Sequence, residues 1–244
     1  MALRLDAAAR QRRSPAVFRF PDTPGLAVRP PCIAVLGGSF DPVHNGHVAL
    51  GAYFIRLLVP DELRVIPAGN PWQKQELQAS GPDRVEMVRC AFGKQPVPVT
   101  IDRQEIRRHT ATYTIDTLRA LRTELGPQAS IALLIGADQL QQLDSWREWR
   151  QLFDYAHICA ASRPGFALDA GHVPEPVARE FARRAGTPEQ LRTTPHGLTY
   201  LATNLAVDIS ATEIRAALQR GDRPESLVPH AVLDYIEQHH LYKS

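Results

Sequence analysis

The most constraining feature of this sequence is a turn that links an apolar run to a helical pattern. The apolar run at 32–36 leads directly into Gly-Gly-Ser-Phe-Asp-Pro-Val-His-Asn-Gly-His at 37–47, and helical periodicity follows. Two glycines let the backbone approach a ligand closely, and the first turn of a helix has unpaired N–H groups that favour an anion. His44 and His47 can hydrogen-bond oxygens or carry positive charge near pH 7. The segment therefore predicts a site for nucleotide phosphates.

Simpler interpretations of this segment exist. A glycine pair after a strand can be only a tight turn. The two histidines could bind a metal ion, but they supply two ligands, and zinc would need a third that nothing nearby provides. We therefore expect no metal site built from protein side chains alone. The combined pattern is far more specific than its parts, which favours the phosphate site.

The rest of the chain alternates short apolar runs with amphipathic segments. Strands are expected at 32–36, 63–67, 97–101, 131–135, 156–161 and 198–202, and helices at 48–58, 83–92, 114–125 and 176–185. This alternation predicts an α/β fold with a doubly wound parallel sheet, whose ligands bind beyond the carboxyl ends of the strands.

We divide the chain into three parts. Residues 1–31 are rich in arginine and proline without periodicity, so we expect a disordered or loosely docked N-terminal extension. Its composition also resembles an organellar transit peptide. Residues 32–208 are expected to form the α/β domain, and residues 209–244 a small helical C-terminal portion of the same domain.

Composition limits the classes of function. A chain of 244 residues with 44% hydrophobic content is long enough for one sizeable core. A net charge of +2 is too small to predict a surface that coats nucleic acid, and no apolar run is long enough to span a membrane. Cys32, Cys90 and Cys159 lie in apolar runs without C-x-x-C spacing, so we expect buried free thiols and a cytoplasmic protein. The sequence leaves the oligomeric state open.

Two segments resemble signatures of one enzyme superfamily. Residues 37–47 resemble the GxFDPxHxGH signature of nucleotidyltransferases that transfer AMP or CMP, and Ile-Ser-Ala-Thr-Glu-Ile-Arg at 209–215 resembles ISxTxIR. Within this superfamily the chain is most similar to bacterial nicotinate-mononucleotide adenylyltransferases, and the similarity runs from Cys32 almost to the end. It implies a Rossmann-like fold and transfer of AMP from ATP to nicotinate mononucleotide, with Mg²⁺ accompanying ATP, in NAD biosynthesis.

The resemblance implies roles for residues at the ATP end. His44, His47 and Arg215 would be catalytic. The ATP phosphates would be bound by Gly37, Gly38, Ser39, Phe40, Ser210, Thr212 and Lys74. From the residues alone, Ser210 with Glu213 is a capping-box pattern, and a solvated arginine is the default for Arg215. In the loop at 67–74, Trp72 and Gln73 replace the usual Pro and His, which leaves the role of Lys74 open.

A second group would bind the mononucleotide. The resemblance implies contacts from Thr114, Trp146, Arg163 and Arg84, and a ribose contact from Asp138. Four of these residues have a structural alternative: a helix cap for Thr114 and Asp138, core packing for Trp146 and a surface ion pair for Arg84. Because Trp149 lies three residues after Trp146, one of the two is expected to be core packing.

Three other functions are compatible with part of this pattern. A sister nucleotidyltransferase shares the histidine motif but usually lacks the segments that resemble Ser-Tyr-Thr and Ile-Gly-x-Asp. An aminoacyl-tRNA synthetase would need a lysine-rich loop that the sequence does not contain. A nucleotide sensor would bind without turnover. An acid pair, Asp102 and Glu105, could serve general acid–base chemistry, which this reaction does not need.

Overall fold

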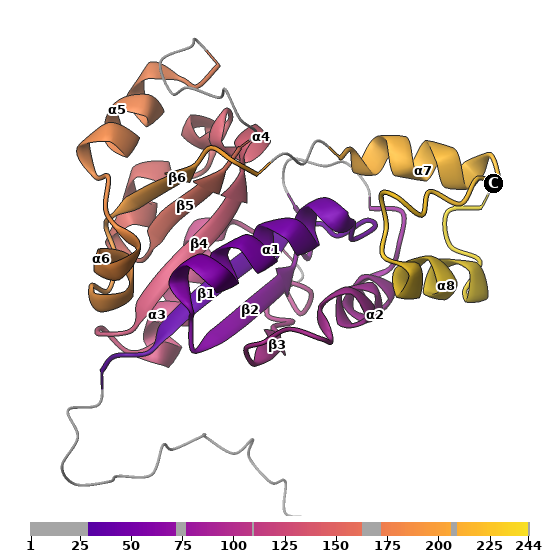
Figure 1. Ribbon diagram of the computed structural model, residues 1–244, viewed down its shortest axis with the longest axis horizontal. Helices are drawn as coiled ribbons and strands as arrows, with labels where there is room; N and C mark the ends of the chain where they lie inside the picture. The colour runs from indigo at the N-terminus through magenta and orange to yellow at the C-terminus, as the bar shows by residue number, and fades with distance from the viewer. Residues whose placement is uncertain (1–28, 72–76, 109, 163–171, 206–208, 244) are drawn as a thin grey trace, which may run out of the picture.

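The computed structural model describes residues 29–71, 77–108, 110–162, 172–205 and 209–243. Its centre is a six-stranded sheet with the order β3-β2-β1-β4-β5-β6, in which all neighbouring strands are parallel (Figure 1). The strands are β1 Cys32–Gly38, β2 Glu62–Pro67, β3 Val99–Ile101, β4 Ser130–Gly136, β5 His157–Ala161 and β6 Thr199–Ala202. The predicted doubly wound sheet is confirmed.

Helices cover both faces of this sheet (Figure 1). The α-helices are α1 Asn45–Leu58, α2 Gly81–Phe92, α3 Thr114–Leu125, α4 Ala137–Leu140, α5 Glu175–Arg183, α6 Pro188–Thr193, α7 Ala211–Gln219 and α8 His230–Gln238. Two short 3₁₀ helices, η1 Leu143–Ser145 and η2 Trp149–Asp154, follow α4. None of the helices in the described ranges is both long and apolar enough to cross a membrane.

The core has two parts because side chains alternate along each strand. In β1, Ala34 and Leu36 belong to the apolar cluster that includes α1 and α2. Ile33 and Val35 belong to the cluster that includes α3 and η2 on the opposite face. Strands buried on both faces read as continuous apolar runs, as the run at 32–36 does.

The strand order fixes where a ligand can bind. From β1 the chain builds toward β3 on one side, and β4 then returns to pair with the other side of β1. The loops after β1 and β4 therefore diverge to opposite faces and leave a crevice at the carboxyl ends of these strands. The first signature follows β1, so the fold places it at this switch point.

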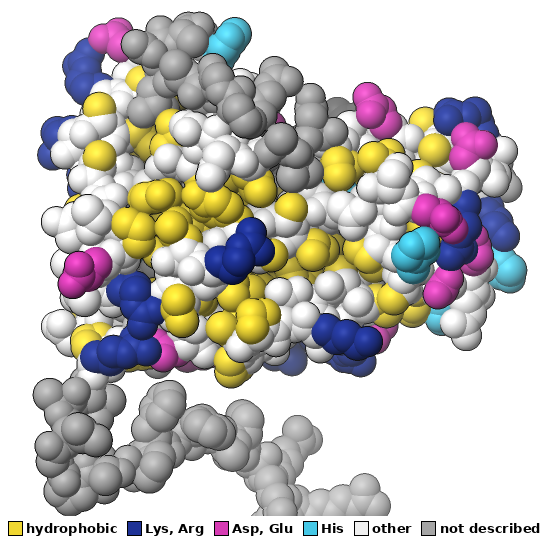
Figure 2. Space-filling model, viewed as in Figure 1, with side chains coloured by type: hydrophobic (Ala, Val, Ile, Leu, Met, Phe, Trp, Pro, Cys, Tyr) yellow, Lys and Arg dark blue, Asp and Glu magenta, His cyan; other side chains and the backbone are white. Residues whose placement is uncertain are grey.

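The C-terminal helices pack on the α2 side of the molecule (Figure 1). Ile214 of α7 and Ile236 of α8 belong to the same apolar cluster as α1 and α2. Figure 2 shows apolar side chains across the middle of this face, over α1, β5 and β6, and charged side chains gathered at the α7–α8 end.

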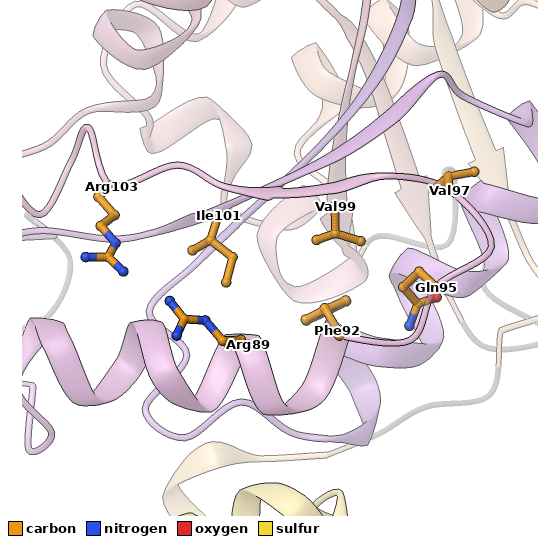
Figure 3. Close-up of a pocket in the computed structure, with 8 residues that line it drawn as sticks. Arg89, Phe92, Gln95, Val97, Val99, Ile101 and Arg103 are labelled. Carbon is orange, nitrogen blue, oxygen red and sulfur yellow. The ribbon is translucent and has the colours of Figure 1, made fainter. Parts of the chain in front are cut away.

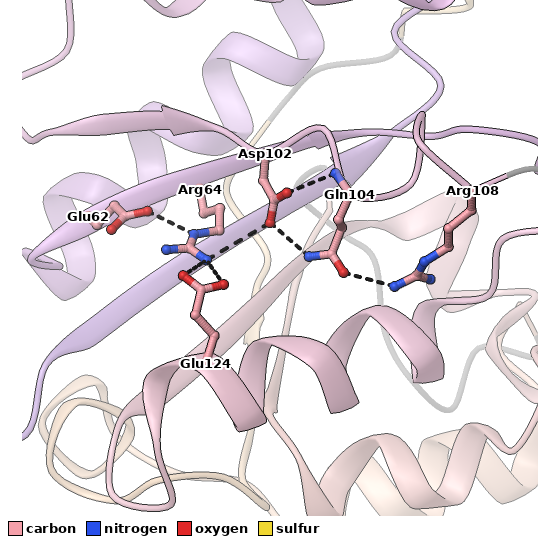
Figure 4. Close-up of polar contacts among 6 residues, drawn as sticks. All are labelled: Glu62, Arg64, Asp102, Gln104, Arg108 and Glu124. Atoms are coloured by element: carbon pink, nitrogen blue, oxygen red, sulfur yellow. Dashed lines mark hydrogen bonds and ion pairs between the residues drawn. The ribbon is translucent and has the colours of Figure 1, made fainter. Parts of the chain in front are cut away.

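A buried charge anchors the β2–β3 edge of the sheet. The Arg64 side chain is 8% exposed, and it donates to Glu62 at 2.9 Å and to Glu124 at 2.8 Å, with Asp102 at 3.9 Å (Figure 4). Several carboxylates are needed because an unpaired buried guanidinium would be strongly destabilising. Asp102 also accepts from the Gln104 amide at 2.7 Å, so the network orders the segment that leads toward the crevice.

One expectation about the cysteines is wrong. Cys32 and Cys159 are buried in β1 and β5, but Cys90 is exposed. It lies in α2, whose buried side chains include Met87 and Val88, and Cys90 points away from that face. Burial raises the pKa of the Cys159 thiol.

Candidate active site

A hollow of about 700 Å³ lies at the carboxyl ends of the strands. Its walls come from the loops after β1, β2 and β4, the start of α3 and the start of α7. The predicted residues among those that line it are Gly37, Gly38, Ser39, His44, His47, Thr114, Asp138, Trp146, Ser210 and Thr212. Parts of the chain far apart in sequence thus form one site.

The two histidines form a stacked pair at the start of α1. His44 is the N-cap residue, and the ring centroids of His44 and His47 are 3.7 Å apart at an interplanar angle of 28°. The backbone N–H of His44 donates to Nδ1 of His47 at 3.2 Å. A neutral His47 ring therefore carries its proton on Nε2. The pair lies where the N–H groups of the helix favour an anion.

The glycines of the first signature serve different purposes. A Cβ atom at Gly37 would meet nothing within 4 Å, so this glycine leaves the hollow open. A Cβ atom at Gly38 would lie 3.1 Å from the Phe40 ring, which is fully buried and contacts the edge of His47 at 4.8 Å between centroids. Phe40 is absent from the walls of the hollow, and its ring supports His47. A phosphate contact at this residue stays a prediction.

The second signature contacts the first. Ser210 is the N-cap of α7 and accepts from the Glu213 N–H at 3.5 Å. Arg215 donates to Thr212 Oγ1 at 3.2 Å and to the backbone oxygen of Asp41 at 2.7 Å. Ser210 and Thr212 line the hollow, whereas Arg215 is not among its lining residues and is joined to it through Thr212.

Arg84 lies below the site instead of in its wall. It is 3% exposed and donates to the backbone oxygens of Ser39 at 2.9 Å, Ala68 at 2.6 Å and Ala79 at 3.3 Å. Burial lowers the pKa of its guanidinium. The donors of Arg84 hold the loops after β1 and β2, so the surface ion pair considered for it is wrong. The mononucleotide contact stays a prediction.

The opposite end of the hollow has an aromatic wall. Trp146 lines it, and its Nε1 is buried without a hydrogen-bond partner among the described residues. Trp149 is 7% exposed and belongs to the core beside α3. The structure thus separates the two tryptophans as the sequence predicts. Thr114 is the first residue of α3, whose N-cap is Tyr113.

Asp138 follows β4 at the switch point. Its carboxylate accepts from the Gln139 amide at 3.1 Å and lies so close to Gly136 that a Cβ atom there would be 2.6 Å from Oδ1. A carboxylate in this position of an α/β sheet commonly accepts from ribose hydroxyls. Lys74 and Arg163 lie outside the described residues, as do Trp72 and Gln73.

Glu105, one of the acid pair noted in the sequence but not predicted as a site residue, also lines the hollow. Its carboxylate accepts from Thr117 Oγ1 at 2.7 Å, and burial raises its pKa. Gly69 packs so closely that a Cβ atom there would lie 2.0 Å from the Glu105 backbone oxygen. The acid pair in the sequence could have identified Glu105 as a wall residue. It is not predicted as one because the expected reaction needs no general acid or base.

A second hollow of about 420 Å³ lies between α2 and β3 (Figure 3). Phe92, Val99 and Ile101 give it an apolar wall, and Arg89 and Arg103 lie at one end. It contains no residue of either signature, so we assign the chemistry to the larger hollow.

Comparisons with known proteins agree with this geometry. A family model described as cytidylyltransferase-like matches residues 35–217. A protein of Herminiimonas arsenicoxydans named "Probable nicotinate-nucleotide adenylyltransferase" is 75% identical over 213 residues, covering 87% of this chain and 97% of that protein. A protein of the same name from Laribacter hongkongensis is 43% identical, covering 87% and 94%.

A solved structure shares the fold. The nicotinic acid mononucleotide adenylyltransferase of Plasmodium falciparum in complex with NaAD has a TM-score of 0.65 at 19% identity, covering 87% of this chain and 97% of that one. At this identity the likeness concerns the fold alone. The closer assignment comes from the sequence relatives, because their identity extends over nearly their whole length. The chain therefore belongs to the nicotinate-nucleotide adenylyltransferase family and to the broader cytidylyltransferase-like family.

Proposed function

We propose that this protein transfers the AMP moiety of ATP to the 5′-phosphate of nicotinate mononucleotide. The products are deamido-NAD and pyrophosphate, and the reaction belongs to NAD biosynthesis. The observation that carries the proposal is that both signatures line one hollow at the switch point of the sheet. The names of the sequence relatives give the nucleotide class.

The chemistry needs positioning and charge neutralisation more than proton transfer. A phosphate monoester is mostly dianionic at neutral pH, so no side-chain base has to create the nucleophile. Its oxygen attacks the α-phosphorus of ATP, and the bond to the bridging oxygen of the β-phosphate breaks. Preorganised donors that stabilise the developing charge then supply the rate enhancement.

Each end of the triphosphate has its own donors in this proposal. His44 and His47, with the backbone of Gly37, Gly38 and Ser39, hold oxygens of the α- and β-phosphates. The departing β- and γ-phosphates are held by Ser210, Thr212, Arg215 and Lys74. Mg²⁺ enters with ATP as part of the substrate, carried by phosphate oxygens and water.

The mononucleotide lies at the Trp146 end. The indole face stacks on the electron-poor pyridine ring. Backbone N–H groups at Thr114, where α3 begins, favour the nicotinate carboxylate. The Asp138 carboxylate accepts a hydrogen bond from a ribose hydroxyl, and Arg163 also contacts the mononucleotide. We place the reaction in the cytoplasm, a compartment that suits the free thiols of Cys32, Cys90 and Cys159.

One assay tests the substrate assignment. Purified protein is incubated with ATP and Mg²⁺ plus either nicotinate mononucleotide or its amide, and pyrophosphate and dinucleotide are measured. We expect faster turnover with the acid and a dinucleotide of the mass of deamido-NAD. Equal rates with the two mononucleotides would contradict the nicotinate assignment, and no pyrophosphate with either would contradict adenylyl transfer.

A further inference from the structure

The C-terminal end of the chain lies against the first signature. After α8 the backbone is left-handed at His240 (φ 54°) and Tyr242 (φ 59°). Such backbone is unfavourable for residues with a side chain and persists where the surroundings fix it. Tyr242 is 7% exposed and belongs to the apolar cluster of α1 and α2. The packing therefore fixes the direction of its ring.

The hydroxyl of Tyr242 donates to Asp41, the aspartate of the first signature, at 2.7 Å. Asp41 is 2% exposed, and its carboxylate also accepts from the backbone N–H groups of Gln78 at 2.8 Å and Ala79 at 3.0 Å. A buried carboxylate requires such donors. Burial raises the pKa of Tyr242, which keeps its hydroxyl protonated as a donor.

Because Asp41 is held in place, it also fixes the position of groups that we assign to ATP binding. Its backbone oxygen accepts from Arg215 at 2.7 Å. Its neighbour Phe40 packs on the edge of His47, and Ser39 is held by Arg84. A displacement of Asp41 would therefore shift an arginine of the second signature and the loop of the first signature together.

We propose that Tyr242 is a positioning residue for adenylyl transfer, which acts through Asp41 to fix Arg215 and the first-signature loop against the ATP phosphates. Tyr242 lies outside the walls of the hollow and acts without touching ATP. This inference rests on the proposed function. The signature motif and the end of the chain are thus one functional unit, although 201 positions separate Asp41 from Tyr242.

The chain contains a matched control for this contact. Tyr235 of α8 donates its hydroxyl to Asp83 of α2 at 3.0 Å. The groups are the same in both contacts, a tyrosine hydroxyl and an aspartate carboxylate. The Tyr235 contact joins α8 to α2, and Asp83 is not part of either signature. Y242F and Y235F therefore remove the same kind of hydrogen bond, and only Y242F removes one from the site.

The test compares steady-state kinetics of the two variants with the wild type. For Y242F we expect kcat/KM for ATP to fall about tenfold, the scale of one hydrogen bond to a charged group. KM for nicotinate mononucleotide should stay within about twofold, because other residues form that end of the hollow. Y235F should match the wild type in both values.

Amide hydrogen exchange supplies a second readout that does not depend on activity. In Y242F, the N–H groups of Gln78 and Ala79 should exchange faster than in the wild type and in Y235F, because Asp41 is released. Wild-type kinetics and exchange in Y242F would overturn the inference. So would a loss of kcat in Y242F that follows the folded fraction while both KM values stay constant. An inactive wild type would instead contradict the proposed function.

Discussion

At the scale of single residues, the sequence predicts the types of groups in the site better than their directions. His44, His47 and Ser210 lie in the hollow because their positions next to helix starts follow from the local pattern. Phe40 belongs to the first signature, and Arg84 is a site residue that the family resemblance implies. Both side chains are nevertheless buried below the loops. Which way a side chain turns depends on packing partners from other elements, and these are not visible in a local motif.

Replacing His47 tests the role of the stacked pair. We expect H47A to lower kcat by roughly a hundredfold or more, the scale of one lost preorganised electrostatic contact. The assay is pyrophosphate release at saturating ATP and nicotinate mononucleotide. The exposed His172 provides the control, and H172A should keep wild-type turnover. Near-normal turnover in H47A would remove His47 from the catalytic groups.

At the scale of elements, periodicity predicts the strands and helices well, and errors occur at ends and exposed faces. The expected strand at 97–101 begins at Val99, because β3 is an edge strand that pairs with β2 only through residues 99–101. Cys90 fits an apolar run but lies on the outer face of α2. The contact of Arg64 with Glu62 is local, whereas its contacts with Asp102 and Glu124 depend on how the elements pack.

A buried histidine makes the β5–β6 junction sensitive to acid. His157 is fully buried, its Nδ1 accepts from the Leu198 N–H at 3.1 Å, and its Nε2 lies 2.8 Å from the Thr194 oxygen, so the neutral ring satisfies both contacts. Burial lowers the pKa of His157 to about 4 from its ordinary value of 6.5. Between these two pKa values, His157 binds more protons in the unfolded chain than in the folded one. Its contribution to the free energy of unfolding is therefore fully present above pH 6.5 and is lost as the pH drops toward 4.

Urea unfolding at pH 7 and pH 5 measures this effect. We expect His157 to account for a loss of about 2 kcal/mol in the free energy of unfolding of the wild type between these pH values. His157→Gln should lose less over the same interval, although it is less stable at pH 7. His172→Gln should behave as the wild type. An equal acid loss in His157→Gln and in the wild type would show that this imidazole is not the sensitive group.

At the scale of the whole molecule, the site exists because topology brings distant segments to one edge of the sheet. The alternating pattern predicts the doubly wound parallel sheet and the position of the first signature beyond β1, whereas the strand order comes from the structure. The contact between Arg215 and Asp41 spans 174 positions and connects the two signatures. The contact of Tyr242 with Asp41 has no counterpart in any local pattern, so only the folded chain reveals it.

The central claim is that one ATP molecule is held at once by both signatures. A crystal structure of this protein with a non-hydrolysable ATP analogue and Mg²⁺ tests it most directly. We predict that His44 or His47 lies within hydrogen-bond distance of the α- or β-phosphate, and that the N-terminus of α7, with Ser210 or Thr212, holds the β- or γ-phosphate of the same molecule. A triphosphate that contacts only one of the two signatures, or lies in the hollow between α2 and β3, would contradict the account.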